Sequence, residues 1–262
     1  MRVEILRGRR TSSTAEPMLV GIAKAARAAG DKVVETRTFQ GQSEWLVLFG
    51  AGAAVNDHAR RAQIKRGGRV LVWDLGYFGR RKHTGFLRCS IDRDHPQHLL
   101  DATEPEQSRW AGHGIALRED ADPAGFILLV GLGRKSREYL KADDWEQRTY
   151  QRLRQRFPER TVLHRPKPNH EGPKLHCERD STTPIEVLLR RSSLVVCRHS
   201  NVAVDAAIAG VPFEAEDGAA MWLAQRPFTP ENRLDFLRRL AWWQWQATEA
   251  PAAWAFVKGV SA

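Results

Sequence analysis

The chain has 262 residues, of which 42% are hydrophobic and 27% charged, enough for one large or two small α/β domains. No apolar run reaches about 18 residues and no charged-then-apolar leader begins the chain, so we expect neither a membrane span nor a signal peptide. Three cysteines without Cys-x-x-Cys spacing argue against a disulfide framework and a zinc site, and indicate a reducing cytoplasm.

The net charge of +10 is more than a small-molecule enzyme needs, whereas a protein that acts on a polyanion gains affinity and association rate from it. An arginine-rich proteome from a GC-rich genome is the alternative explanation. The cations are clustered, however, which compositional bias explains less well. The clusters are residues 60–66, 80–82, 134–137 and 148–160.

In the first half of the chain, short apolar runs alternate with helical patterns, which predicts a parallel sheet with right-handed crossovers. The glycines at 50 and 52 lack the third glycine of a dinucleotide fingerprint, so they are weak evidence for NAD. The expected strands are residues 2–6, 32–35, 44–49 and 69–73, and the expected helices are residues 17–29 and 53–66.

Residues 91–122 are irregular and polar, and we place a domain boundary at their end. The N-terminal domain is therefore expected to span residues 1–122. Asp92-Arg93-Asp94 and Asp120-Ala121-Asp122 have the Asp-x-Asp spacing of metal-dependent transferases, but both precede the second domain. We interpret them as loop acids and predict no metal site.

The second domain, residues 123–230, repeats the α/β alternation. Polar turns follow three of its strands, at residues 131–136, 165–167 and 200–201, and we expect them to converge at one edge of a parallel sheet. The expected strands are residues 126–130, 161–164, 194–197 and 211–213, and the expected helices are residues 143–156, 184–190 and 202–209.

The third of these turns has the features of an anion site. Ser200 and Asn201 stand where a helix N-cap is expected, before an alanine-rich helix that Gly210 ends. Free backbone N–H groups and the helix dipole favour an anion there. Asp205, one turn further on, could bind a pair of ribose hydroxyls. An ordinary strand–helix–strand unit with a capped helix is the alternative.

Residues 231–246 predict one amphipathic helix in the C-terminal region. Its apolar side carries Leu234, Leu237, Leu240, Ala241 and Trp245.

The Ser200-Asn201 turn, Asp205 and the Gly210-Val211-Pro212 exit resemble the donor sites of GT-B glycosyltransferases and, more distantly, of sugar-nucleotide 2-epimerases. Those sites have a Ser-rich turn, an acidic residue near the helix start and a Gly-x-Pro exit. Their acid is usually Glu, and Asp205 is one methylene shorter. Residues 74–80 and 237–257 are also similar to phage-encoded GT-B-like proteins, including DNA glycosyltransferases.

The resemblance implies an α/β, GT-B-like fold, with two Rossmann-like parallel-sheet domains and C-terminal helices, residues 231–262, that pack back on the N-terminal domain. It implies a nucleotide diphosphate sugar, such as a UDP-sugar, as co-substrate. A helix dipole and cations can stabilise the leaving diphosphate without an obligatory metal. The expected donor-binding residues are Gly131, Gly133, Arg134, Lys135, Arg165, Ser200, Asn201 and Asp205.

Transfer to a hydroxyl also needs a base that takes the acceptor proton. We predict Asp74, which directly follows a strand of the first domain, with Asp94 as the second candidate. The residues after Asp74 mix aromatic and cationic side chains, which suits stacking on a base and pairing with phosphates. Asp92, His95 and Asp57 are the rival bases, and Arg80, Arg81 and Lys82 are the expected DNA contacts.

Together these features predict a monomeric DNA glycosyltransferase in the cytoplasm, that of the host cell if a phage encodes it. Its acceptors would be 5-hydroxymethyl-pyrimidines such as 5-hydroxymethylcytosine in duplex DNA, because a bare base offers no suitable hydroxyl. Two alternatives stay open. One is another nucleotide-sugar enzyme, a saccharide transferase or 2-epimerase. The other is a non-enzymatic basic nucleic-acid-binding protein.

Overall fold

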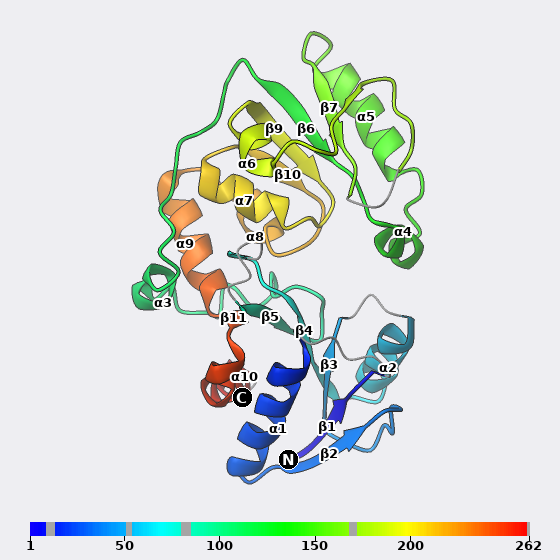
Figure 1. The fold of residues 1–262 in the computed structure, drawn as a ribbon, viewed down its shortest axis with the longest axis vertical. Coiled ribbons are helices and arrows are strands. Elements are labelled where there is room, and N and C mark those ends of the chain that lie inside the picture. Colours follow the sequence, from blue (N-terminus) through cyan, green and yellow to red (C-terminus); the bar gives the residue numbers. More distant parts are fainter. Residues whose placement is uncertain (9–13, 51–53, 80–84, 168–171, 261–262) are drawn as a thin grey trace. The chain divides into compact units, whose positions relative to one another are not determined.

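The computed structural model describes the chain except for residues 9–13, 51–53, 80–84, 168–171 and 261–262 (Figure 1). The described residues form two compact units, each with its own sheet. Unit 1 consists of Met1–His113 and Arg238–Ala262, and unit 2 of Gly114–Leu237.

The described strands of unit 1 form one mixed sheet in the order β11-β5-β4-β3-β1-β2. Four neighbouring strands run parallel, and two strands at one edge complete the sheet through antiparallel pairing. The parallel strands are β1 (Arg2–Leu6), β2 (Lys32–Thr36), β3 (Trp45–Phe49) and β4 (Arg69–Leu75), and the edge strands are β5 (Leu87–Ile91) and β11 (Gln244–Trp245).

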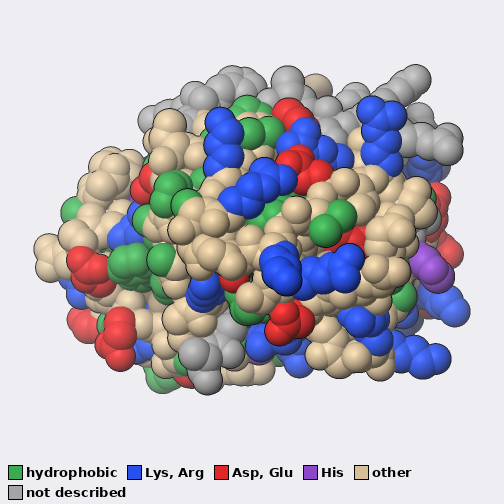
Figure 2. All heavy atoms as spheres, turned by 90° about the horizontal axis from the view of Figure 1, so that it is seen from below, with side chains coloured by type: hydrophobic (Ala, Val, Ile, Leu, Met, Phe, Trp, Pro, Cys, Tyr) green, Lys and Arg blue, Asp and Glu red, His purple; other side chains and the backbone are tan. Residues whose placement is uncertain are grey.

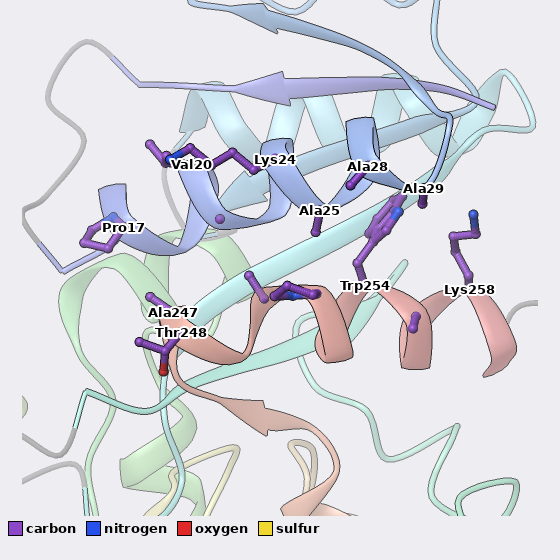
Figure 3. Close-up of a pocket in the computed structure, with 14 residues that line it drawn as sticks. Pro17, Val20, Lys24, Ala25, Ala28, Ala29, Ala247, Thr248, Trp254 and Lys258 are labelled. Atoms are coloured by element: carbon purple, nitrogen blue, oxygen red, sulfur yellow. The ribbon is translucent and has the colours of Figure 1, made fainter.

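Helices α1 (Glu16–Ala28) and α10 (Ala250–Val260) pack closely in unit 1. Gly21 makes this approach possible, because a Cβ on it would lie 2.7 Å from the Ala250 Cβ. A groove of about 1010 Å³ runs along the two helices, lined mostly by alanine and other apolar side chains (Figure 3). The other helices described in unit 1 are α2 (Ala54–Lys65), α3 (Gln107–Ala111) and the short 3-10 helix η1 (Ala247–Glu249).

The described strands of unit 2 form a parallel sheet in the order β10-β9-β6-β7-β8. These strands are β6 (Phe126–Val130), β7 (Val162–Arg165), β8 (Glu178–Arg179), β9 (Ser192–Cys197) and β10 (Phe213–Ala215). The helices that begin in this unit are α4 (Arg134–Leu140), α5 (Trp145–Arg156), α6 (Ile185–Leu189), α7 (Val202–Ala209), α8 (Met221–Ala224) and α9 (Pro230–Ala241).

The core of unit 2 explains the apolar runs in its central strands β6, β7 and β9. Ile127, Leu129, Val162 and Val196 pack in one cluster with Leu153 of α5, and each of these side chains is buried. Strands of a parallel sheet are covered on both faces, so they read as continuous apolar runs rather than alternating ones.

The structure confirms the predicted α/β class with Rossmann-like domains. The described sheet of unit 2 is parallel, and that of unit 1 is parallel except for β5 and β11. Three details of the sequence analysis are wrong. The region predicted to be irregular from residue 91 begins with the last residue of the antiparallel strand β5 and includes α3. The polar turn predicted at residues 131–136 contains the start of α4, which begins at Arg134. The helix predicted over residues 231–246 ends at Ala241, because Gln244 and Trp245 pair with Arg88 and Leu87 as strand β11.

Within the described residues, none of the helices has both the length and the apolar character needed to cross a membrane.

Candidate functional site

The turns that follow β6, β7 and β9 meet at the carboxyl edge of the unit 2 sheet. The Lys167 Nζ donates to the Ser200 Oγ over 3.0 Å, which joins the β7 turn to the β9 turn. The Ser136 Oγ and the His199 Nε2 lie 3.1 Å apart and share a hydrogen bond, which joins α4 to the β9 turn. We call these residues, together with Gly133, the basic edge.

The two glycines after β6 have different roles in the fold. A Cβ on Gly131 would lie 2.9 Å from the Glu146 Oε1, 3.0 Å from the His164 Nε2 and 3.3 Å from the Pro166 Cα, so only glycine fits. Among the described residues, the atom nearest to a Cβ on Gly133 is the Lys167 Cγ, at 3.9 Å, an ordinary van der Waals distance. The close packing at residue 131 therefore requires glycine, whereas the described surroundings of Gly133 would accept a Cβ.

The N-terminus of α7 is capped by the side chain of Ser200, one of the two residues at which the sequence predicts an N-cap. Asn201 occupies the N-cap position, but its side chain makes no capping hydrogen bond. Instead the Ser200 Oγ accepts the Val202 N–H over 3.3 Å. Gly210 ends the helix with a φ of 77°, as expected, and Asp205 is half-buried in the first turn.

The predicted cations of the donor site differ in their surroundings. Arg134 is largely exposed, with its Nε 3.7 Å from the Glu138 carboxylate. Lys135 is exposed at the start of α4. The Arg165 Nη1 donates to the Asp180 carbonyl over 3.4 Å, and thus toward the turn that follows β8.

His199 lies outside the three turns that the sequence analysis predicts, whereas Lys167 and Ser136 lie within them but are not among the expected donor-binding residues. His199 closely follows β9 and directly precedes Ser200, so its position at a strand's carboxyl end was the available signal.

Beneath the Gly131–Gly133 turn lies a buried polar cluster. The Glu146 Oε1 accepts the Leu132 N–H over 2.8 Å and pairs with the Arg137 guanidinium. The neighbouring His164 side chain is almost completely buried. Burial, together with the cations of Arg179 and Arg137, lowers the pKa of His164 to about 4. The imidazole is therefore neutral near pH 7.

The predicted base Asp74 lies within β4, opposite Arg88 of β5. Its Oδ2 is 2.9 Å from the Arg88 Nη2, and its Oδ1 accepts the Leu75 N–H over 2.7 Å. The Asp74 side chain is 35% exposed. The buried Arg88 also donates to the Asp94 backbone carbonyl, so one guanidinium contacts both candidate bases.

The rival acids of unit 1 are engaged in ion pairs and hydrogen bonds. Asp92, whose φ is 64°, accepts the Val70 N–H over 2.8 Å and pairs with Arg69 over 2.8 Å. Asp57 pairs with Arg60 over 3.1 Å, and the Arg60 Nε lies 3.9 Å from the Asp94 carboxylate.

His95, the remaining rival, is buried and shares a hydrogen bond of 3.0 Å between its Nδ1 and the Tyr77 hydroxyl. Burial raises the pKa of Tyr77, so this hydroxyl keeps its proton.

The acids with Asp-x-Asp spacing near the boundary make local contacts. Asp120 pairs with Arg118 over 2.7 Å, and the Asp122 Oδ1 accepts the Ala124 N–H over 3.0 Å. Over the described ranges, His, Cys, Asp and Glu side chains form no group of three or more that could hold a metal ion. The predicted DNA contacts Arg80, Arg81 and Lys82 lie outside the described residues.

Comparison with known proteins gives matches among solved structures alone. The sequence matches no protein-family model and no curated protein. The structure is similar to the beta Kdo 2,7 transferase of Thermosulfurimonas dismutans KpsC, with a TM-score of 0.53 and 14% identity over 98% of this chain and 99% of that one. It is also similar to the beta Kdo 2,4 transferase of the same protein, with a TM-score of 0.51 and 13% identity over 93% and 91% of the two chains. At such identities the likeness shows the fold, which is the GT-B-like one that the sequence analysis predicts.

Proposed function

We propose that this chain is a glycosyltransferase that uses a nucleotide-activated sugar as donor. The observation that carries the proposal is the basic edge, where Lys167, Ser200 and the Ser136–His199 pair meet at the N-terminus of α7. Ligands of open parallel sheets bind at the carboxyl ends of the strands, and helix N-termini favour phosphate groups.

In this proposal the basic edge stabilises the leaving nucleotide. The Lys167 ammonium and the positive end of the α7 dipole offset the charge that develops on the phosphate as the glycosidic bond breaks. Because Gly133 has no side chain, the phosphate can approach its backbone. Asp205 binds the ribose hydroxyls, and a UDP-sugar is the proposed donor.

Asp74 is the proposed base that takes the proton of the acceptor hydroxyl. Arg88 and the Leu75 N–H orient its carboxylate, and about a third of the side chain is exposed to an acceptor. Asp94 is the second candidate, since its carboxylate lies 3.9 Å from the Arg60 Nε and about a third of its side chain is exposed.

For the acceptor we propose a 5-hydroxymethyl-pyrimidine in duplex DNA. The net charge of +10 supports a polyanionic acceptor, and Lys and Arg side chains are frequent on the face that Figure 2 shows. Arg80, Arg81 and Lys82 are the proposed phosphate contacts.

A saccharide acceptor is the second candidate, because both similar structures are named as Kdo transferases. Some of the clustered cations are also engaged by carboxylates rather than available to phosphates alone. Arg152 and Arg156, of the cluster at residues 148–160, both pair with Glu214.

One experiment separates these acceptors. The protein is incubated with a panel of nucleotide sugars, including activated Kdo, and with hydroxymethylated duplex DNA, plain duplex DNA or oligosaccharides. Mass spectrometry of the nucleosides and saccharides then identifies the product. A sugar on the hydroxymethylated base alone supports the DNA proposal, and a modified oligosaccharide supports the second candidate. No transfer with any pair contradicts both.

A triple variant tests the DNA contacts directly. Replacing Arg80, Arg81 and Lys82 with Ala should weaken DNA binding and reduce its salt dependence by about one unit for each phosphate that the variant no longer binds. Affinity for the nucleotide should be retained, because the variant leaves unit 2 intact. Unchanged DNA binding would place the contacts elsewhere, with residues 148–160 as the next candidate.

A further inference from the structure

Glu146 is a fully buried carboxylate in the first turn of α5. Its Oε1 accepts two hydrogen bonds, from the Leu132 N–H over 2.8 Å and from the Arg137 guanidinium. The Oε2 has no hydrogen-bond partner among the described residues. One oxygen therefore carries the interactions of the group.

Stability alone does not explain this pair. Removing two charges from water is costly, and a well-packed apolar pair in the same place is often as stable or more so. What an apolar pair cannot supply is a directional acceptor for the Leu132 N–H. The carboxylate therefore contributes geometry to the Gly131–Gly133 turn.

The contacts around Glu146 fix the turn on several sides. The Gly131 N–H donates to the Arg165 carbonyl over 2.8 Å, and the Arg137 Nη1 donates to the Asp143 carbonyl over 3.0 Å. The missing side chain of Gly131 leaves room for the Glu146 carboxylate on one side and the neutral His164 ring on another. The backbone between residues 131 and 133 is thus held by α5, α4 and β7 together.

The Gly131–Gly133 turn ends at Gly133, which is itself part of the basic edge. Gly133 lies beside the Lys167 stem, and the Lys167 ammonium bonds to Ser200. A shift of the turn would move the Gly133 backbone relative to the Lys167 ammonium and the Ser200 hydroxyl, next to which the proposed phosphate binds.

We infer that Glu146 is a positioning residue of the donor site, which acts through the Leu132 N–H to hold the Gly131–Gly133 turn against the phosphate of the nucleotide. This inference rests on the proposed function. Glu146 itself lies beneath the turn and touches no substrate.

The test compares the wild type with Glu146→Gln and with the double variant Glu146→Met/Arg137→Met. Glu146→Gln keeps an oxygen for the Leu132 N–H but loses the charge that holds Arg137. The double variant removes the buried charges together, so it is expected to fold, but it has no acceptor for that N–H. Glu159→Gln, an exposed acid of unit 2, is the matched control.

Affinities for UDP, GDP and CMP are measured by calorimetry, and KM is measured for donor and acceptor separately. In the double variant we expect the nucleotide Kd and the donor KM to rise about tenfold or more, with a smaller rise for Glu146→Gln. The acceptor KM should stay within about twofold of the wild type, a split that a general loss of structure would not produce. Amide exchange at Leu132 should accelerate in the double variant.

Two negative results have different meanings. If the wild type binds none of the nucleotides, the proposed function is wrong and the inference falls with it. If the wild type binds a nucleotide and the folded double variant binds it equally tightly, the inference alone is wrong.

Discussion

Both units have polar residues at or near the carboxyl ends of parallel strands, but the contacts of these residues differ between the units. In unit 2, hydrogen bonds join Lys167 to Ser200 and Ser136 to His199. These side chains remain partly exposed. In unit 1, Asp74 is engaged by the buried Arg88 of an antiparallel strand. The polar groups at the carboxyl edge of the unit 2 sheet thus stay partly exposed, whereas the Asp74 carboxylate of unit 1 is bound to the neighbouring strand.

The largest effect is expected from Asp74→Asn, which tests whether the Asp74 carboxylate acts as a base although it is paired with Arg88. Turnover should fall by about 10²–10⁴-fold, the usual contribution of a general base. Steady-state kinetics at saturating donor and acceptor measure it. Near-wild-type turnover in Asp74→Asn, together with a loss in Asp94→Asn, would assign the base to Asp94.

The second effect concerns the structural side of the same contact. Arg88→Met removes the partner of Asp74, the donor to the Asp94 carbonyl and a cation placed 5.6 Å from the Tyr77 ring centre. We expect unit 1 to lose about 2–4 kcal/mol of unfolding free energy. Hydrogen exchange resolved by residue measures it. Exchange in unit 2 should stay unchanged, and equal loss in both units would contradict the comparison.

The third effect is a pH dependence that belongs to unit 2. His164 has a folded pKa of about 4, below its ordinary value of 6.5, so the unfolded chain binds a proton that the folded one does not between these values. Stability should therefore be full above about pH 6.5 and fall with acid by up to about 1.4 kcal/mol per pH unit, about 3 kcal/mol by pH 4.

A His164→Gln variant, which cannot titrate, provides the comparison for this effect. Its urea unfolding, followed between pH 4 and 7, should lose less stability with acid than the wild type does. An identical acid slope in both proteins would rule out His164 as its source. His113 of unit 1, whose pKa burial also lowers to about 4, contributes to the slope that remains.

The smallest effect separates ligand binding from folding at the basic edge. Lys167→Met should weaken nucleotide binding by about 1.5–3 kcal/mol, the range for a hydrogen bond to a charged group. The free energy of unfolding should change by less than about 1 kcal/mol, since Lys167 is only partly buried. Calorimetry and thermal unfolding measure the two quantities. Lys141→Met, at an exposed position of the same unit, is the control.

The sequence predicts the elements whose signal is local. Strands β1 and β6 are predicted to the residue, because each is a compact run of mostly apolar side chains next to a turn. Strands β5 and β11 were missed, since β5 contains Arg88 and Ser90 and β11 has only two residues. The two strands pair with each other although they are far apart in the chain, and hydrophobic periodicity gives no information on such pairing.

The same limit applies to the candidate site. The turns at residues 131–136, 165–167 and 200–201 could be placed on one edge because parallel strands dictate it. The partner of Asp74 could not be predicted from the sequence, because only the register of β4 against β5 brings Arg88 opposite it. The role of Glu146 could not be predicted either. In the sequence it is an ordinary acidic residue of a helix, and only the folded structure shows that it accepts the Leu132 N–H.

The path of the chain has a consequence for how the protein is made. Unit 2 is inserted between the two segments of unit 1, and β11 from the second segment pairs with β5 from the first. During synthesis, every residue of unit 2 leaves the ribosome before residue 238 does. Domains generally fold as units while the chain is elongated. Unit 2 can therefore complete its sheet first, while unit 1 waits for its edge strand and for α10 to cover α1.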